Sequence, residues 1–136
     1  MSTSSEALGK NTFRDFIEQM GISYEENTNN DLGEHDFEII VGGFMDESIS
    51  LTVDVRCRRE PWDAYVFENI GHYNDDGADI YVFSDAVSEQ VPKLIGWLKN
   101  EDFEQSAIIE GNYAFEDSQL RSMDTFTDYM YEVSQW

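Results

Sequence analysis

The stretch ISLTVDVRCRR, residues 49–59, alternates apolar and polar side chains and so predicts a β-strand with one buried face. The side chains expected on that face are Ile49, Leu51, Val53, Val55 and Cys57. Arg56 and Arg58 fall on the opposite face, where an acidic neighbour on the next strand, such as Glu38, could meet them. The arginines are therefore expected to offset carboxylates on the fold's own surface, and a phosphate or carboxylate ligand site is the alternative.

The charge surrounding this strand is strongly one-sided. The 136 residues carry a formal net charge of −21, and eleven acidic residues lie between Arg14 and Arg56 with no lysine or arginine among them. Such a surface repels nucleic acid and anionic membranes, and it costs the compact state some self-repulsion. A high-salt habitat, a basic partner, bound cations or simple solubility would each make that cost tolerable.

The composition is that of a folded domain. Hydrophobic residues make up 40% of the chain, too many for a disordered acidic tail, and the length suits a single core. We expect a flexible start over residues 1–10 and one acidic α+β domain over residues 11–136. The apolar runs are too short to span a membrane, and the start lacks the features of a signal peptide, so a cytoplasmic location is expected.

Alternation predicts a further strand at residues 36–43, and aromatic and β-branched composition predicts strands at residues 64–70 and 79–84. Residues 106–117 fit either one strand bent at Gly111 or a hairpin with Gly111 and Asn112 as its central residues. A polar loop is expected at residues 23–36 and a turn at residues 73–78, each rich in Asn and Asp.

Three helices are expected from apolar residues at helical spacing. The first begins after Thr12 and ends at Gly21, and the second follows a cap at Ser84 or Asp85, with Pro92 kinking it or marking a later start. The third covers residues 118–136. The apolar stripes are Phe13, Phe16, Ile17 and Met20; Val87, Val91, Leu94, Ile95 and Leu98; and Leu120, Met123, Phe126, Met130 and Val133. The fold class predicted is α+β, an antiparallel sheet of four to six strands packed with an N-terminal, a middle and a C-terminal helix.

No motif names a reaction. Residues 72–83 match only part of a calcium-binding EF-hand loop, because Phe83 stands where the bidentate Glu is required. Alternation turns the single Cys57 toward the core, and His35 and His72 are expected on the surface. We therefore predict no catalytic residue, no metal ligand set and no cofactor.

The strongest functional pattern is acidic. Asp124, Asp128 and Glu132 follow one another at helical i, i+4, i+8 spacing, about 6 Å apart, and the predicted second patch is Asp75, Asp76 and Asp79. Regularly spaced carboxylates on a folded surface could occupy a groove that normally binds phosphates. The plainer interpretation is a solvated helix face.

Two resemblances bear on function. In size, acidity and lack of catalytic motifs the chain resembles phage-encoded anti-restriction and anti-CRISPR proteins that imitate DNA, a likeness of composition from which no residue role is carried over. The segment TFRDFIEQMGIS, residues 12–23, and the order of expected elements resemble the YbjN and type III secretion chaperone-like fold. That likeness implies a small acidic protein, often dimeric, which holds partner proteins.

The expected function is therefore a non-enzymatic inhibitor. It would present a DNA-mimicking surface to a basic nucleic-acid-binding protein such as a defence nuclease, without touching nucleic acid or membrane itself. The alternative is a small acidic chaperone-like or regulatory adaptor that binds its client through apolar surface, for which a homodimer is one option. An ordinary domain from a high-salt organism is the third interpretation.

Overall fold

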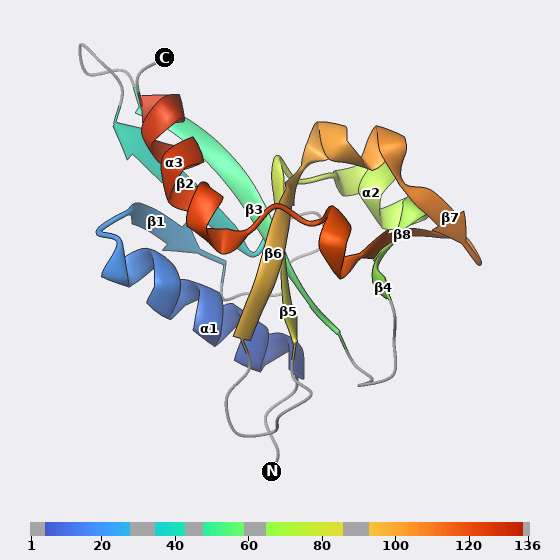
Figure 1. Cartoon of the computed structure of the whole chain (residues 1–136). Coiled ribbons are helices and arrows are strands. Elements are labelled where there is room, and N and C mark those ends of the chain that lie inside the picture. Colours follow the sequence, from blue (N-terminus) through green and yellow to red (C-terminus); the bar gives the residue numbers. More distant parts are fainter. Residues whose placement is uncertain (1–4, 28–34, 43–47, 59–64, 86–92, 135–136) are drawn as a thin grey trace.

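The structure, a computed structural model, describes residues 5–27, 35–42, 48–58, 65–85 and 93–134. A mixed five-stranded sheet carries two helices on one face and a three-stranded sheet with a short helix on the other (Figure 1). The α+β class and the N-terminal and C-terminal helices are thus confirmed. The large sheet is mixed rather than purely antiparallel, because β3 and β5 pair in parallel.

The large sheet has the strand order β1-β2-β3-β5-β6. Its strands are Ser23–Glu26, Phe37–Gly42, Ser48–Arg58, Ile80–Asp85 and Lys93–Lys99. The predicted strands at β2, β3 and β5 are confirmed, whereas β1 lies in the expected polar loop. Its pairing is supported by side chains, since the ring of Tyr24 packs 5.9 Å from that of Phe37 and Arg14 forms an ion pair with Glu26.

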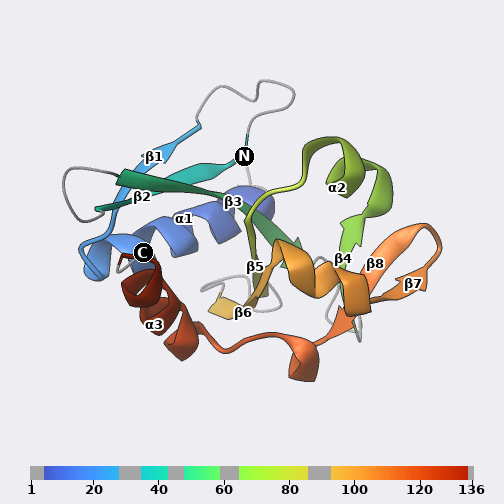
Figure 2. The same cartoon turned by 90° about the horizontal axis from the view of Figure 1, so that it is seen from above.

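The helices α1 (Ser5–Gln19) and α3 (Met123–Ser134) cover one face of this sheet (Figure 2). Phe13 and Phe126 are fully buried there and meet edge to face at 5.8 Å, as the predicted apolar stripes require. The left-handed Gly21 ends the first helical segment as expected. The helix begins earlier than predicted, at Ser5, so Thr12 lies inside it and its hydroxyl donates to the Leu8 carbonyl rather than capping the start.

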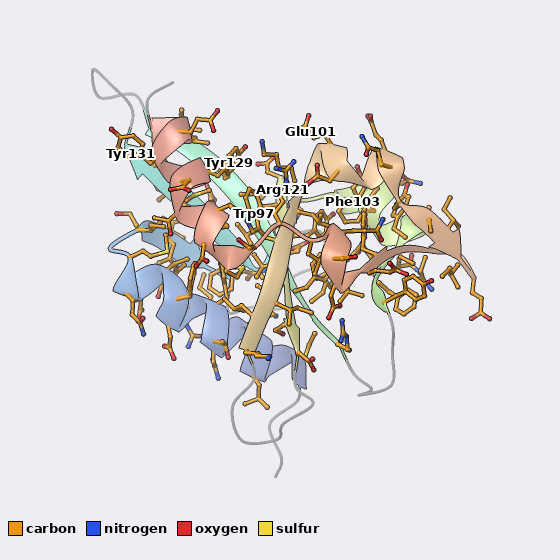
Figure 3. All side chains as sticks on the ribbon, viewed as in Figure 1. Trp97, Glu101, Phe103, Arg121, Tyr129 and Tyr131 are labelled. Atoms are coloured by element: carbon orange, nitrogen blue, oxygen red, sulfur yellow. The ribbon has the colours of Figure 1, made fainter. Side chains whose placement is uncertain are left out.

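The second layer consists of β4 (Tyr65–Asn69), β8 (Asn112–Glu116) and β7 (Ala107–Ile109), in that order, with α2 (Ile70–Asp76) and the 3-10 helix η2 (Asn100–Gln105). Residues 107–116 form the hairpin alternative. Its central residues are Glu110 and Gly111, one position earlier than predicted, and both have positive φ. The apolar side chains of this layer pack on the second face of the large sheet around Phe103 (Figure 3).

The predicted middle helix is wrong for the residues that the structure describes. Lys93–Lys99 is the strand β6, paired antiparallel with β5, and the helix α2 instead occupies the expected turn at residues 73–78. Residues 86–92, including Pro92, lie outside the described part. The error has a physical cause, because the short apolar run at residues 94–98 satisfies both helical and strand periods and becomes a strand where its backbone finds a partner.

The outer edge of β6 is closed by the segment that leads into α3. Trp97 and Arg121 exchange two backbone hydrogen bonds of 2.9 Å each, and the Arg121 guanidinium lies 5.5 Å from the Trp97 ring. Figure 3 shows these two residues and Tyr129 gathered where β6 meets α3. The chain comes so close that a Cβ on Gly96 would lie 2.6 Å from Leu120 Cβ.

No helix in the described ranges is long and apolar enough to cross a membrane.

Candidate functional site

The site lies at the part of β3 that extends beyond its pairing with β2. β2 pairs with β3 as far as Val53, so residues 54–58 continue without a β2 partner on that side. The Val55 backbone N–H donates instead to the Asp36 carboxylate, 2.9 Å away, and the Asp36 N–H donates to Asp54 Oδ1 at 3.2 Å. Two carboxylates are thereby fixed against the backbone at the end of the strand pair.

Arg56 connects these carboxylates to the second layer. Asp54 and Arg56 lie two residues apart on one face of β3, where the Arg56 guanidinium contacts Asp54 at 3.4 Å and Asp36 at 3.8 Å. On its other side it forms a close ion pair with Glu68 of β4. Only 4% of the Asp54 side chain and 2% of the Glu68 side chain are exposed. The guanidinium carbon also lies 5.9 Å from the ring of Tyr81.

Two further basic groups border the carboxylates. Lys10 of α1 places its Nζ 3.1 Å from Asp36 Oδ1, and His35 Nδ1 lies 3.3 Å from each Asp54 oxygen. His35 was expected on the surface, but its side chain is only 16% exposed. We call the whole group the charged cluster: Lys10, His35, Asp36, Asp54, Arg56 and Glu68.

The electrostatics of the charged cluster keep Arg56 ionised. Burial alone would lower the pKa of its guanidinium, but the hydrogen bond and charge of Glu68, with the charges of Asp54 and Asp36, raise that pKa above its usual value. Removing such charges from water costs several kcal/mol per ion, roughly what their attraction returns. A buried ion pair is therefore weak evidence of selection for stability alone.

The arginines do pair with carboxylates of the fold, but the predicted partner Glu38 is wrong. Glu38 pairs with Thr52 across the β2–β3 ladder, whereas Arg56 forms ion pairs with the carboxylates of the charged cluster. At the end of β3, Arg58 forms ion pairs with Asp85 and Asp117. The signal that could have revealed the site was Asp54 beside Arg56 in a strand whose other face is wholly apolar.

The predicted acidic residues do not form one surface. Asp124, Asp128 and Glu132 are exposed on α3, which lies on the opposite side of the large sheet from α2. Asp75 and Asp76 belong to α2, and their side chains lie outside what the structure describes. Asp79 is engaged elsewhere, since it accepts from the Thr52 N–H at 3.0 Å. That these residues bind a partner stays a prediction.

Among the described residues, two open hollows of about 310 Å³ each lie away from the charged cluster. One is lined by Met20, Gly21, Ile22, Ser23, Ile40, Val41, Gly42, Thr127, Met130 and Tyr131. The other is lined by Leu98, Asp102, Gln105, Phe115, Gln119 and Arg121, of which Asp102 and Arg121 pair with each other. In neither hollow do several acidic and basic side chains come together at one place. Within the described residues, no group of three or more His, Cys, Asp or Glu side chains is placed to hold a metal ion.

Comparisons with known proteins find a likeness in structure but none in sequence. No family model matches the chain, and no curated protein matches its sequence. A solved structure of Archaeoglobus fulgidus Hjc, a Holliday junction resolvase from an archaeal hyperthermophile, is similar to the fold with a TM-score of 0.49 and 10% sequence identity. The likeness covers 88% of this chain and 95% of that chain.

This finding contradicts the expected function. The similar structure is that of an enzyme, which conflicts with a non-enzymatic protein. We accordingly withdraw the DNA-mimicking anti-CRISPR or anti-restriction inhibitor, the chaperone-like adaptor and the prediction that the chain is no enzyme. A likeness at 10% identity describes the fold alone.

Proposed function

We propose that the chain is a hydrolase for phosphodiester bonds and that the charged cluster is its active site. The observation that carries the proposal is the position of Asp54. Its carboxylate contacts the imidazole of His35 at 3.3 Å and the guanidinium of Arg56 at 3.4 Å, and so joins a proton acceptor to a cation. Buried titratable groups with opposed charges are typical of functional sites.

The roles follow from the chemistry of each group. The cations of Lys10 and Arg56 suit the oxygens of a phosphoryl group, on which negative charge accumulates during attack. Asp54 orients His35, as the third group of a nucleophile-activating triad orients its base. Asp36 holds Lys10 and the end of β3 in place through contacts of 3.1 Å and 2.9 Å.

Water is the only co-reactant that this hydrolysis requires. The water oxygen forms a bond to phosphorus while its proton passes to His35, and the ester P–O bond breaks. The departing alkoxide takes up the proton that His35 received, which leaves a phosphomonoester and an alcohol. The described residues do not fit a metal ion, so no step here passes through one.

Nucleic acid is the phosphodiester that we would test first, which departs from the prediction that the chain does not bind it. The net charge of −21 opposes such binding at low salt, and screening weakens that repulsion as salt rises. We place the protein in the cytoplasm, where this substrate is present.

The experiment is a cleavage assay with labelled single-stranded, double-stranded and branched DNA, from 0.05 M to about 2 M NaCl. Purified wild-type protein is compared with Asp54→Asn, with His35→Gln and with the matched surface variant Glu132→Gln, each confirmed as folded by circular dichroism. We expect cleavage that falls about 100-fold or more in the first two variants and is unchanged in the third.

Two results would count against the proposal. Absence of wild-type cleavage over the whole salt range would remove the function, and equal cleavage by Asp54→Asn would remove the site. Parallel reactions with EDTA and with Mg²⁺ examine the mechanism. Cleavage in EDTA supports water activation by His35 and Asp54, whereas cleavage only with Mg²⁺ keeps the phosphodiesterase and overturns that assignment of the base.

A further inference from the structure

The end of β3 holds a second guanidinium that the proposed reaction does not use. Arg58 follows Arg56 by two residues and lies on the same face of the strand. Its side chain is only 9% exposed, and its terminal nitrogens pair with Asp85, at 3.6 Å, and with Asp117. Its Nε atom is buried and has no hydrogen-bond partner among the described residues.

An unsatisfied donor of this kind needs an explanation. Leaving a buried N–H without an acceptor costs about 1–3 kcal/mol, more when the group is charged. Buried polar groups that lack a protein partner commonly bind a water or an ion. A guanidinium offers two parallel donors along one edge, the geometry that matches two oxygens of a phosphate.

The partners of Arg58 leave room for such an exchange. Asp85 is 14% exposed and lies beside Arg58 in the β3–β5 ladder, so it forms a fixed contact. Asp117 begins the 3-10 helix η3 (Asp117–Gln119), and its side chain is 55% exposed. A phosphate could replace this accessible carboxylate at the terminal nitrogen and also accept the N–H of Nε.

We propose that Arg58 binds a phosphate adjacent to the phosphate that is cleaved. This inference rests on the proposed function. Positions two apart on a strand are separated by about 6.6 Å, which gives Arg56 and Arg58 room for two phosphate groups side by side. The substrate is then a strand with at least two successive phosphates, and Arg58 is a positioning residue that sets where the strand lies.

The test follows the Nε–H signals of the five arginines by NMR in ¹⁵N-labelled wild-type protein. Arg58→Lys, which keeps the charge but removes Nε–H, assigns the signal, and Asp117→Asn provides a second assignment if that variant does not fold. The probes are inorganic phosphate and a 5′-phosphorylated DNA dinucleotide, added at constant ionic strength. Arg14, paired with Glu26, is the internal control.

We expect a saturable shift of the Arg58 signal with no shift of the Arg14 signal. Asp117→Asn tightens dinucleotide binding about tenfold, because a competing carboxylate is removed. In the cleavage assay, Arg58→Lys raises KM about tenfold with kcat unchanged, since a contact made equally in ground and transition states is lost.

The outcomes separate the two proposals. An Arg58 signal that shifts while the DNA stays intact supports this binding site and removes the proposed hydrolase. An Arg58 signal that does not move overturns the inference, whether or not cleavage occurs. Cleavage by Arg58→Lys with unchanged KM overturns it as well and leaves the hydrolase in place.

Discussion

Arg56 of β3 and Glu68 of β4 join the two sheets through an ion pair in which the Glu68 side chain is 2% exposed and the Arg56 side chain 24%. Arg56 donates from Nε and, at 3.3 Å, from a terminal nitrogen to the two oxygens of Glu68. The pair lies where β3 faces the second layer, among the other carboxylates of the charged cluster.

Removing one partner of this pair is expected to destabilise the protein strongly. Arg56→Met leaves Glu68 buried beside Asp54 without their shared cation, and the expected loss in unfolding free energy is about 3–5 kcal/mol. The double variant Arg56→Met, Glu68→Leu recovers most of it, because neither charge then remains to be solvated. Urea denaturation of both variants measures the coupling.

The matched control is Arg14→Met, which breaks a more exposed pair with Glu26 and is expected to cost about 1 kcal/mol or less. Equal losses for Arg56→Met and its double variant would contradict the coupling.

Stability is expected to fall as the pH rises above about 10. Burial raises the pKa of the Tyr81 phenol far above its usual value, and burial also raises the pKa of Tyr73 and of Tyr129. Unfolded tyrosines ionise near pH 10, so above that pH the native state retains more protons than the unfolded state. The free energy of unfolding therefore decreases as the pH rises further.

Urea midpoints at pH 8, 10 and 11 measure this slope. Tyr81→Phe makes the slope shallower, and at pH 8 it costs about 1–3 kcal/mol because the Ala78 N–H loses its acceptor. A slope that is identical in the variant would show that Tyr81 does not contribute to it.

Gly96 is expected to tolerate no side chain. A Cβ there would lie 2.6 Å from Leu120 Cβ and 2.9 Å from the Arg121 carbonyl oxygen, so Gly96→Ala must push the Leu120 segment away from β6. We expect a loss of about 1–3 kcal/mol, measured as a lower melting temperature. Gly42→Ala is the control, since no atom of the described residues lies within 4 Å of its Cβ position. Similar effects in the two variants would argue against the close approach.

The β7–β8 hairpin offers a stabilising change. Glu110 has a φ of 50° and Gly111 a φ of 80°, the left-handed pair of a two-residue type I′ turn, in which Asn-Gly is preferred. Glu110→Asn is expected to raise stability by about 0.5–1 kcal/mol, and Gly111→Ala to lower it. A higher urea midpoint in the first variant and a lower one in the second would agree. The opposite order would mean that the turn has another conformation.

The charge of −21 predicts that the protein becomes more stable as NaCl is added, because screening reduces self-repulsion. Thermal unfolding between 0.1 M and about 2 M NaCl measures this dependence. Neutralising the exposed row on α3 with Asp124→Asn, Asp128→Asn and Glu132→Gln should make the dependence shallower. A melting temperature independent of salt would show that repulsion among the acidic side chains costs the folded state little stability.

Elements with a long, unambiguous period were predictable. Alternation over residues 49–59 and the apolar stripes that include Phe13 and Phe126 define the first core, and the structure confirms them. Residues 94–98 were not predictable, because whether a short apolar run becomes helix or strand depends on the partner that its backbone finds, here β5.

The candidate site escaped prediction for a different reason. Asp36, Arg56 and Glu68 are far apart in the chain, and single carboxylates in an acidic sequence carry almost no information. They meet only in the fold, where β3 extends past its last pairing with β2 and Arg56 contacts both carboxylates. His35 was predicted on the surface because its polar loop gives no sign of the contact with Asp54, which lies 19 residues further along the chain.

The parallel pairing of β3 with β5 has a consequence for how the protein opens. Between these strands the chain leaves the large sheet, forms β4 and α2, and returns. β3 and β5 therefore pair only when β4, the first strand of the second sheet, is also in place. Pairings between strands so distant in sequence form slowly. We therefore expect the amides of β3, β4 and β5 to exchange with deuterium together, as one cooperative unit.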